Sequence, residues 1–204
     1  MRICPHEQGS DGWLRDRLGV PTASNFAKLI TTTGKPSTSA EGYINQLIAE
    51  RLTGVRTEVK VTEWMQRGTE LESAAREFYE LFSDNSVYEV GFCKHDVLEC
   101  GMSPDGLIDT TTLEGGLEIK CPAPATHVSY LRGNKLPSTY KQQVMGQMWI
   151  AELEWVDFVS YHPDMPVLIT RAYRDDDYIN LLADEVEKAC EIIETQYQKL
   201  GALI

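Results

Sequence analysis

Two carboxylates and a lysine stand close together in the middle of the chain. Asp105 lies in the segment SPDGLI at residues 103–108, and Glu118 and Lys120 lie in LEIKCP at residues 117–122. Carboxylate oxygens are ligands that Mg²⁺ prefers, and a bound metal lowers the pKa of water and neutralises charge on phosphoryl oxygens. A lysine ammonium beside that water could orient it or help to deprotonate it. These residue types therefore suit metal-assisted hydrolysis of a phosphodiester.

Local strand geometry could bring these three side chains together. Residues 117–121 are β-prone and are followed by Pro122, as at the end of a strand. Side chains alternate between the faces of a strand, so Glu118 and Lys120 share one face, and a hairpin would place Asp105 beside Glu118. The alternative is an ordinary amphipathic hairpin with an exposed Glu and Lys, because E-x-K alone is a weak motif.

The elements that must position these residues can be predicted from periodicity and turn signals. Capping residues and helical apolar spacing predict helices over 22–30, 41–52, 62–82, 138–153 and 178–200. Short β-prone runs broken by glycines occupy 87–109, and strands are predicted over 117–121, 155–161 and 167–173. The order of helices, sheet, helix, sheet and helix predicts an α/β fold with a mixed central β-sheet flanked by helices.

Length and composition predict one domain without a membrane segment. The chain has 204 residues with 42% hydrophobic content, which is enough for one sizeable core, so residues 1–204 are expected to form a single domain. No apolar run approaches the roughly 18 residues needed to cross a bilayer. The N-terminus lacks the layout of a secretory signal, so a cytoplasmic location is expected.

The sulfur and imidazole groups argue against a disulfide framework or a zinc site. The five cysteines are scattered, and none form a C-x-x-C motif. The four histidines are also dispersed, with no pair at i, i+4. Net charge is −12 with a pI near 4.8, so any surface that binds the phosphates of a substrate must be a local concentration of basic residues.

The two central segments resemble the active-site motif of the phage lambda exonuclease and YqaJ-like viral recombinase family, within the PD-(D/E)xK nuclease superfamily. Three further blocks occur in the family's order: WLRDRLGVPTAS at 13–24, RGTELESAAR at 67–76 and YKQQVMGQMW at 140–149. The blocks span about two thirds of the chain. The resemblance implies a PD-(D/E)xK restriction-endonuclease-like nuclease fold.

The resemblance also implies a metal centre. Asp105 and Glu118, with the Ile119 backbone carbonyl, would hold one Mg²⁺, and Asp105 would face a second. Mn²⁺ would substitute for Mg²⁺. Glu72 would lie near the second metal, directly or through water. The alternative for Glu72 is an i, i+4 partner of Arg76, and both roles are compatible.

Other matched positions imply contacts with DNA. Arg17, Ser24 and Ser103 match residues that grip a terminal 5′-phosphate in the family, although Ser24 could instead be a helix N-cap. Tyr140, Gln143 and Gln147 fall at i, i+3 and i+7, a polar stripe that could face either the site or solvent. The family resemblance favours a catalytic-site role for Gln143 and a DNA-binding role for Tyr140. The sequence departs from the family at Met145, where relatives are expected to carry a second glutamine.

The implied activity is a Mg²⁺-dependent 5′-to-3′ exonuclease acting on double-stranded DNA ends. It would release mononucleotides and leave a 3′ single-stranded tail for recombination by single-strand annealing. The resemblance further implies a ring-shaped homotrimer and a single-strand annealing protein as partner. Two alternatives remain open: a structure- or site-specific endonuclease of the same fold, and a non-catalytic DNA-end-binding scaffold.

Overall fold

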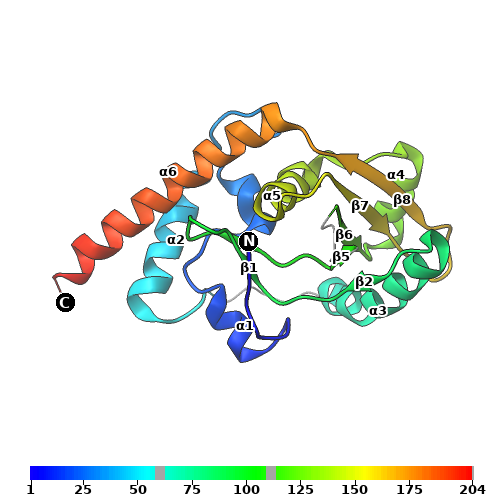
Figure 1. The fold of residues 1–204 in the computed structure, drawn as a ribbon, viewed down its shortest axis with the longest axis horizontal. Helices are drawn as coiled ribbons and strands as arrows, with labels where there is room; N and C mark the ends of the chain where they lie inside the picture. The colour runs from blue at the N-terminus through cyan, green and yellow to red at the C-terminus, as the bar shows by residue number, and fades with distance from the viewer. Residues whose placement is uncertain (58–62, 109–113, 204) are drawn as a thin grey trace.

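The computed structural model describes residues 1–57, 63–108 and 114–203 (Figure 1). The predicted helix start at Thr62 and most of the loop that links Asp105 to Glu118, residues 109–113, lie outside these ranges. Within the described ranges, no helix is long and apolar enough to pass through a bilayer. The five cysteines are all free thiols, and four of them are buried.

A five-stranded mixed sheet forms the centre of the fold. Its strands are β2 (Val87–Tyr88), β5 (Gly106–Ile108), β6 (Gly115–Lys120), β7 (Trp155–Ser160) and β8 (Leu168–Tyr173), in the order β2-β5-β6-β7-β8. Strands β6 and β7 are parallel, and every other neighbouring pair is antiparallel. The predicted mixed α/β architecture is therefore confirmed.

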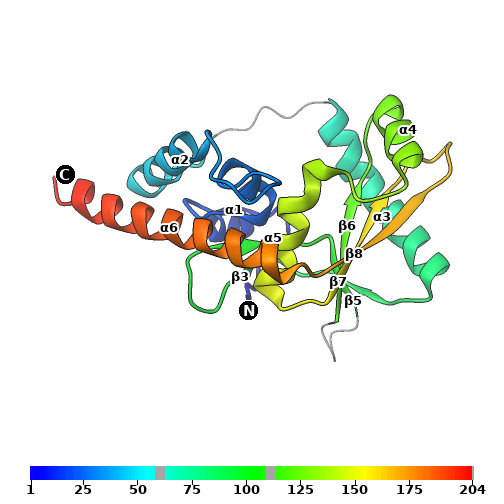
Figure 2. The same cartoon turned by 90° about the horizontal axis from the view of Figure 1, so that it is seen from above.

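The two faces of strand β6 carry different side chains. Leu117 and Ile119 pack in an apolar cluster with Ala75 and Tyr79 of helix α3 (Glu63–Ser83). The other face of the strand is turned toward helix α5 (Lys141–Ala151), which lies on the opposite side of the sheet from α3 (Figure 2). Strand alternation thus separates an apolar face from a polar one, as the sequence predicted.

Two long helices pack against each other on the α5 side. Helix α2 (Ala40–Thr53) ends at Gly54, whose φ of 68° is left-handed, and helix α6 (Asp176–Gly201) begins where the Asp175 side chain accepts a hydrogen bond from the Tyr178 backbone N–H. Figure 2 shows α6 running alongside α2. Both helices were predicted within a few residues of these bounds.

Other segments differ from the predictions. The residues between 87 and 108 divide between two sheets, because β3 (Cys93–Lys94) and β4 (Gly101–Met102) pair with β1 (Arg2–Ile3) in a separate three-stranded sheet, order β1-β3-β4. Helices α1 (Asp11–Asp16) and α4 (Pro124–Gly133) were not predicted. Both are short, and their docking to the rest of the chain stabilises them more than their own propensity does.

Two predicted helices have a different local form. The segment predicted as a helix over 22–30 is a 3₁₀ helix, η1 (Ala23–Lys28), and the one over 138–153 begins with a 3₁₀ turn, η2 (Ser138–Tyr140), before α5. Helix α5 crosses η1 closely. A Cβ atom at Gly146 would lie 2.6 Å from Cδ2 of Phe26, a fully buried ring, so glycine allows this contact.

Replacing Gly146 with alanine should therefore lower the free energy of unfolding by about 1–3 kcal/mol, the usual cost of overpacking a core. The measurement is the urea denaturation midpoint. Gly42→Ala is the matched control, because Gly42 is an exposed residue of α2 with open space at its Cβ position. That substitution should stabilise the protein by roughly 0.4–1 kcal/mol. Equal effects of the two changes would contradict the close contact.

Candidate active site

The hairpin of β5 and β6 brings Asp105 beside Glu118. Gly106 pairs with Leu117, so Asp105, one residue before β5, lies across from Glu118. Oδ2 of Asp105 accepts a 2.6 Å hydrogen bond from the backbone N–H of Ile119, which fixes the carboxylate against the strand. The predicted proximity of the two carboxylates is confirmed.

Glu118 is fully buried and is held by side chains from two elements. The Lys120 ammonium donates to Oε1 of Glu118 from the same face of β6. From α5, the Nε2 atoms of Gln143 and Gln147 donate to Oε1 and Oε2 respectively, each at 2.6 Å. The polar stripe of α5 therefore faces Glu118, and the solvent-facing alternative is wrong. Met145 is directed into the core, 5% exposed.

Gln147 was part of the predicted stripe but was not singled out as a site residue. Its side chain is 1% exposed and contacts Glu118 as closely as Gln143 does. The spacing of four residues along the helix was the signal for it, since residues at i and i+4 share one helical face. A residue at position 145 lies off this helical face, so methionine there does not disturb the contacts of Gln143 and Gln147 with Glu118.

Negative charge is concentrated around Asp105. Burial and the neighbouring Glu118 carboxylate raise the pKa of Asp105 to about 8, with a further contribution from Glu72, while Lys120 and the Ile119 N–H act in the opposite direction. Burial also raises the pKa of Glu72. Burial lowers the pKa of Lys120, but Glu118 and Asp105 outweigh that effect and raise it above the usual value, so this side chain is an ammonium ion.

The donor set suits a hard divalent cation. Asp105 and Glu118 supply carboxylate oxygens, and their charge is only partly balanced by Lys120. In this arrangement their oxygens accept hydrogen bonds from protein donors, and no three His, Cys, Asp or Glu side chains of the described ranges are grouped as a complete metal site. The carboxylates of Asp105 and Glu118 therefore fit a divalent cation, which would take the place of some of these hydrogen-bond donors.

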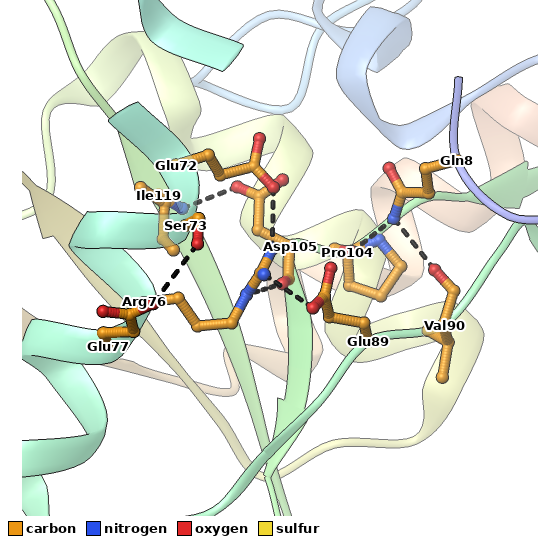
Figure 3. A network of polar contacts seen from close by, with 10 residues as sticks. All are labelled: Gln8, Glu72, Ser73, Arg76, Glu77, Glu89, Val90, Pro104, Asp105 and Ile119. Carbon is orange, nitrogen blue, oxygen red and sulfur yellow. Dashed lines mark hydrogen bonds and ion pairs between the residues drawn. The ribbon is translucent and has the colours of Figure 1, made fainter. Parts of the chain in front are cut away.

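Arg76 of α3 ties Glu72 to Asp105 (Figure 3). Its guanidinium makes 2.8 Å ion pairs with Glu72 and with Glu89, and its Nε donates to the backbone carbonyl of Asp105 at 3.3 Å. The predicted i, i+4 pair of Glu72 and Arg76 is thus confirmed. The bridge to Asp105 was missed, since it joins residues 29 positions apart in the sequence and no local pattern signals it.

A cavity of about 320 Å³ opens at these residues. Its lining includes Glu72, Asp105, Ile119, Lys120 and Tyr140. Glu72 therefore both pairs with Arg76 and lines the cavity. The Lys120 ammonium lies 5.5 Å from the centre of the Tyr140 ring, and the Tyr140 hydroxyl is 3.4 Å from that of Tyr130. Tyr140 thus flanks the lysine at the edge of the cavity.

Arg17 and Ser103 meet near this centre. Nη1 of Arg17 and Nε1 of Trp13 both donate to Oγ of Ser103, at 2.8 and 3.0 Å, and the guanidinium lies 4.2 Å from the centre of the Trp13 ring. Ser103 is two residues from Asp105 in the chain. These contacts link the end of α1 to the segment between β4 and β5 that carries Asp105.

Ser24 is not the N-cap of η1, and its predicted contact with a 5′-phosphate stays a prediction. It lies inside η1, its side chain is exposed, and its hydroxyl is 3.3 Å from that of Thr22. Thr22 occupies the N-cap position and makes no side-chain capping bond, so the N-cap interpretation of Ser24 is wrong. Among the described residues, the Ser24 hydroxyl makes no hydrogen bond with Arg17 or Ser103.

Comparison with known proteins identifies the family. Residues 12–154 match the YqaJ-like viral recombinase domain. The chain belongs to this family. The match contains all of the site residues described above.

Solved structures of similar fold agree with this assignment. The alkaline exonuclease (LHK-Exo) from Laribacter hongkongensis is 35% identical, with a TM-score of 0.84 over 94% of this chain and 96% of that one. The structure of LHK-Exo in complex with dAMP aligns over the same shares with a TM-score of 0.83. A phage-related exonuclease from Haemophilus somnus 129PT, 15% identical, shares the fold with a TM-score of 0.68 over 89% of this chain and 96% of that one. No curated protein sequence matches the chain.

Proposed function

We propose that this family member is a Mg²⁺-dependent DNA exonuclease that degrades one strand of linear duplex DNA from its 5′ end. It would release mononucleotides and leave a 3′ single-stranded overhang for single-strand annealing. The grouping of Asp105, Glu118 and Lys120 carries the proposal, because binding alone does not require that combination: Asp105 and Lys120 line one cavity, and Lys120 donates to the buried Glu118. The 35% identity to a protein named an alkaline exonuclease, which was also crystallised with dAMP, supports it.

The centre would hold two Mg²⁺ ions. One would bind Asp105, Glu118 and the Ile119 carbonyl, and the second would lie at Asp105 and Glu72. Mn²⁺ would substitute for Mg²⁺. The bound cation would lower the pKa of a water molecule and neutralise charge on the phosphate. Gln143 and Gln147 keep the Glu118 carboxylate in place through its two oxygens. Such outer partners commonly tune metal affinity by fixing the orientation of a ligand.

Lys120 would act on the attacking water, either by orienting it or by helping to deprotonate it. Glu118 and Asp105 raise the pKa of Lys120 in the metal-free protein, which favours the ammonium form and the orienting role. Its remaining N–H donors would contact the attacking water or a phosphoryl oxygen. Burial of Glu118 beside it strengthens this electrostatic effect, since charges interact more strongly away from bulk water.

Recognition of the 5′ end would account for polarity. Arg17 donates to Ser103, which is two residues from Asp105, so a terminal phosphate bound there would position the next phosphodiester for attack. Ser24, which is exposed on η1, would also contact the 5′-phosphate, and Tyr140 would contact the DNA at the edge of the cavity.

The proposal extends to assembly and partners. A ring-shaped homotrimer around DNA would let a chain with net charge −12 gather its basic residues in a channel. A single-strand annealing protein would take over the 3′ overhang. Both would operate in the cytoplasm of a bacterial or phage-infected cell.

The deciding experiment is digestion of linear duplex DNA with and without Mg²⁺. Substrates should carry 5′-phosphate or 5′-hydroxyl ends, with closed circular DNA as control. Metal-dependent release of mononucleotides, faster from phosphorylated ends and absent on the circle, is the expected result. Nicking of the circle would instead indicate an endonuclease, and binding without cleavage a scaffold.

Divalent cations should stabilise the protein more at high pH than at low pH. Because burial and Glu118 raise the pKa of folded Asp105 to about 8, against about 4 in the unfolded chain, the metal-free protein should lose stability as pH rises from about 4 to 8. A cation bound to the ionised Asp105 carboxylate would offset its negative charge and restore this stability. The measurement is the Tm with EDTA and with Mg²⁺ at pH 5 and pH 8.5. An Asp105→Asn protein should show little pH dependence of the Mg²⁺ effect, and a wild-type shift equal at both pH values would contradict the argument.

Arg76→Ala should weaken metal binding and lower the cleavage rate by about 10–100-fold, the usual cost of removing a group that orients a ligand. The reason is loss of its contacts with Glu72 and the Asp105 carbonyl. The measurement is the Mg²⁺ concentration dependence of initial rates. Ser73→Ala is the matched control, because Ser73 is exposed on the same helix and contacts Glu77 instead. A Mg²⁺ requirement unchanged in Arg76→Ala would refute the role.

A further inference from the structure

Helix α3 carries a second apolar stripe on the side that faces away from the sheet. Its inner side packs against β6 through the buried Ala75 and Tyr79. Its outer side carries Phe78, Leu81 and Phe82, whose exposed fractions are 39%, 88% and 71%. A surface helix normally has one apolar face, so a second face of large exposed side chains indicates a binding surface. We call these three residues the α3 patch.

The α3 patch is held in a fixed position. The rings of Phe78 and Phe82 stack with 6.1 Å between their centres and 10° between their planes, and Phe78 lies 6.2 Å from the Tyr161 ring. The helix ends at Ser83, whose hydroxyl donates to the backbone carbonyl of the fully buried Tyr79 at 2.7 Å. A preformed surface of this kind loses little conformational entropy on binding.

Carboxylates lie beside the α3 patch without cations to balance them. Residues 77–93 contain Glu77, Glu80, Asp84 and Glu89 and no lysine or arginine. Glu89 pairs with Arg76, whereas the other three acids form no ion pair with any residue that the structure describes. Their negative charge is therefore available to a partner.

The same three carboxylates line a surface cavity of about 460 Å³, together with Leu81, Asn85 and Ser86. Arg171 of β8 reaches this side of the sheet, but both oxygens of Asp157 accept hydrogen bonds from it, so it does not neutralise the cavity. The patch thus continues into an acidic cavity at Leu81.

The α3 patch lies apart from the candidate active site. Leu81 follows Glu72 by nine residues, which is roughly 13 Å along the helix. Figures 1 and 2 both show this end of α3 at the edge of the molecule, far from the C-terminal end of α6. No residue of the patch lines the active-site cavity. A partner on the patch would therefore leave that cavity open.

The charge beside the patch decides which occupant fits it. The carboxylates would repel DNA and the anionic surface of a membrane. A second copy that docked through the same patch would place like charges against each other. An amphipathic helix with basic residues beside its apolar face fits both parts, because apolar side chains at i, i+3 and i+4 can pack on the patch while ammonium groups face the carboxylates.

We propose that the α3 patch binds a basic amphipathic helix of a partner protein. The apolar side chains of that helix cover Leu81 and Phe82, and its basic side chains pair with the carboxylates of the cavity. The inference goes beyond the proposed function, since it involves neither the metal centre nor DNA.

The test uses fluorescein-labelled helical peptides of about 18 residues, which span several turns of helix. The first has leucine at helical spacing and lysine elsewhere, the second has glutamate in place of lysine, and the third has the composition of the first in scrambled order. Fluorescence anisotropy measures the Kd of each. The leucine–lysine helix should bind at least about tenfold more tightly than either of the others.

Leu81→Ala and Phe82→Ala should each weaken binding of the leucine–lysine helix about tenfold, because large apolar side chains at the centre of an interface contribute most of its affinity. Alanine favours the helix, and both side chains are exposed, so the fold should be preserved. Ile192→Ala is the matched control, since Ile192 is a half-exposed apolar residue of α6, and it should leave the Kd unchanged.

Charge reversal tests the acidic part of the surface. A Glu77→Lys, Asp84→Lys double variant should bind the leucine–glutamate helix more tightly than the leucine–lysine helix, which reverses the wild-type preference. Glu80 is left in place because its carboxylate accepts a 2.8 Å hydrogen bond from the Val87 backbone N–H.

Equal binding of the ordered and scrambled peptides, or a Kd unchanged in Leu81→Ala, would overturn the inference, since unspecific attraction to a chain of net charge −12 would then explain the binding. Sedimentation velocity should show the same oligomeric state for Leu81→Ala as for the wild type. Dissociation of a wild-type oligomer by this change would assign the patch to a contact between copies and would also overturn the inference. Digestion of DNA tests the proposed function separately.

Discussion

Replacing Asp105 with asparagine is expected to lower the rate of DNA cleavage on the order of 10³-fold or more. The change removes the charge that a cation needs, yet it keeps an oxygen that can accept the Ile119 N–H hydrogen bond. The measurement is single-turnover digestion of linear duplex DNA with saturating Mg²⁺. Affinity for DNA ends should stay within about threefold of the wild type, which separates loss of chemistry from loss of binding.

The same substitution should stabilise the metal-free protein. Burial and Glu118 raise the pKa of Asp105 to about 8, which means that the ionised carboxylate is unfavourable in the folded state without a cation. A neutral amide avoids that cost. The urea midpoint at pH 8.5 in EDTA should therefore rise. Asp164→Asn is the matched control, because its carboxylate is exposed, and it should change neither rate nor stability. Cleavage by Asp105→Asn within tenfold of the wild type would refute the central role of this residue.

Replacing Lys120 with methionine should lower the rate by about 10²–10³-fold, the usual effect of removing one donor that stabilises charge in a transition state. Methionine keeps the length of the aliphatic stem, and Gln143 and Gln147 would still hold Glu118, so the fold should be preserved. The measurement is kcat at saturating DNA and Mg²⁺. Lys188→Met, at an exposed lysine of α6, is the control for loss of a positive charge.

A second lysine variant distinguishes the two roles open to Lys120. If the ammonium orients water and stabilises charge, Lys120→Arg should retain more activity than Lys120→Met, because arginine keeps the charge and the N–H donors. Equal loss in both variants would favour a proton-transfer role. The raised pKa of Lys120 leads us to expect partial activity in Lys120→Arg.

The glutamines of α5 show how a neutral side chain can support a charged centre. Glu118 is fully buried, and a buried carboxylate is stable only when its oxygens accept hydrogen bonds or face a cation. Gln143 and Gln147 supply donors without adding charge of their own. They thereby leave the negative charge of Glu118 available to a metal, whereas two cations in their place would compete with it.

The relative positions of most site residues could be predicted from the sequence alone, because these positions depend on local backbone geometry. Glu118 and Lys120 share a face since strand side chains alternate, and Gln143 and Gln147 share a face since a helix turns every 3.6 residues. The close pairing of Asp105 and Glu118 needs only a hairpin between neighbouring strands. The mixed sheet and the long helices were likewise predicted, since each has a periodic pattern of apolar residues.

Only the tertiary structure decided which distant segments meet. Arg76 reaches the Asp105 carbonyl, and Glu50 holds Arg56 beside Arg17, through contacts between elements that dock against each other after they form. The division of residues 87–108 between two sheets also depends on pairing with the N-terminal strand β1. Such contacts leave no periodic trace in the sequence, because a side chain that reaches across the fold is not constrained by its neighbours in the chain. Backbone geometry therefore placed the carboxylates and the lysine together, and docking determined their charge environment.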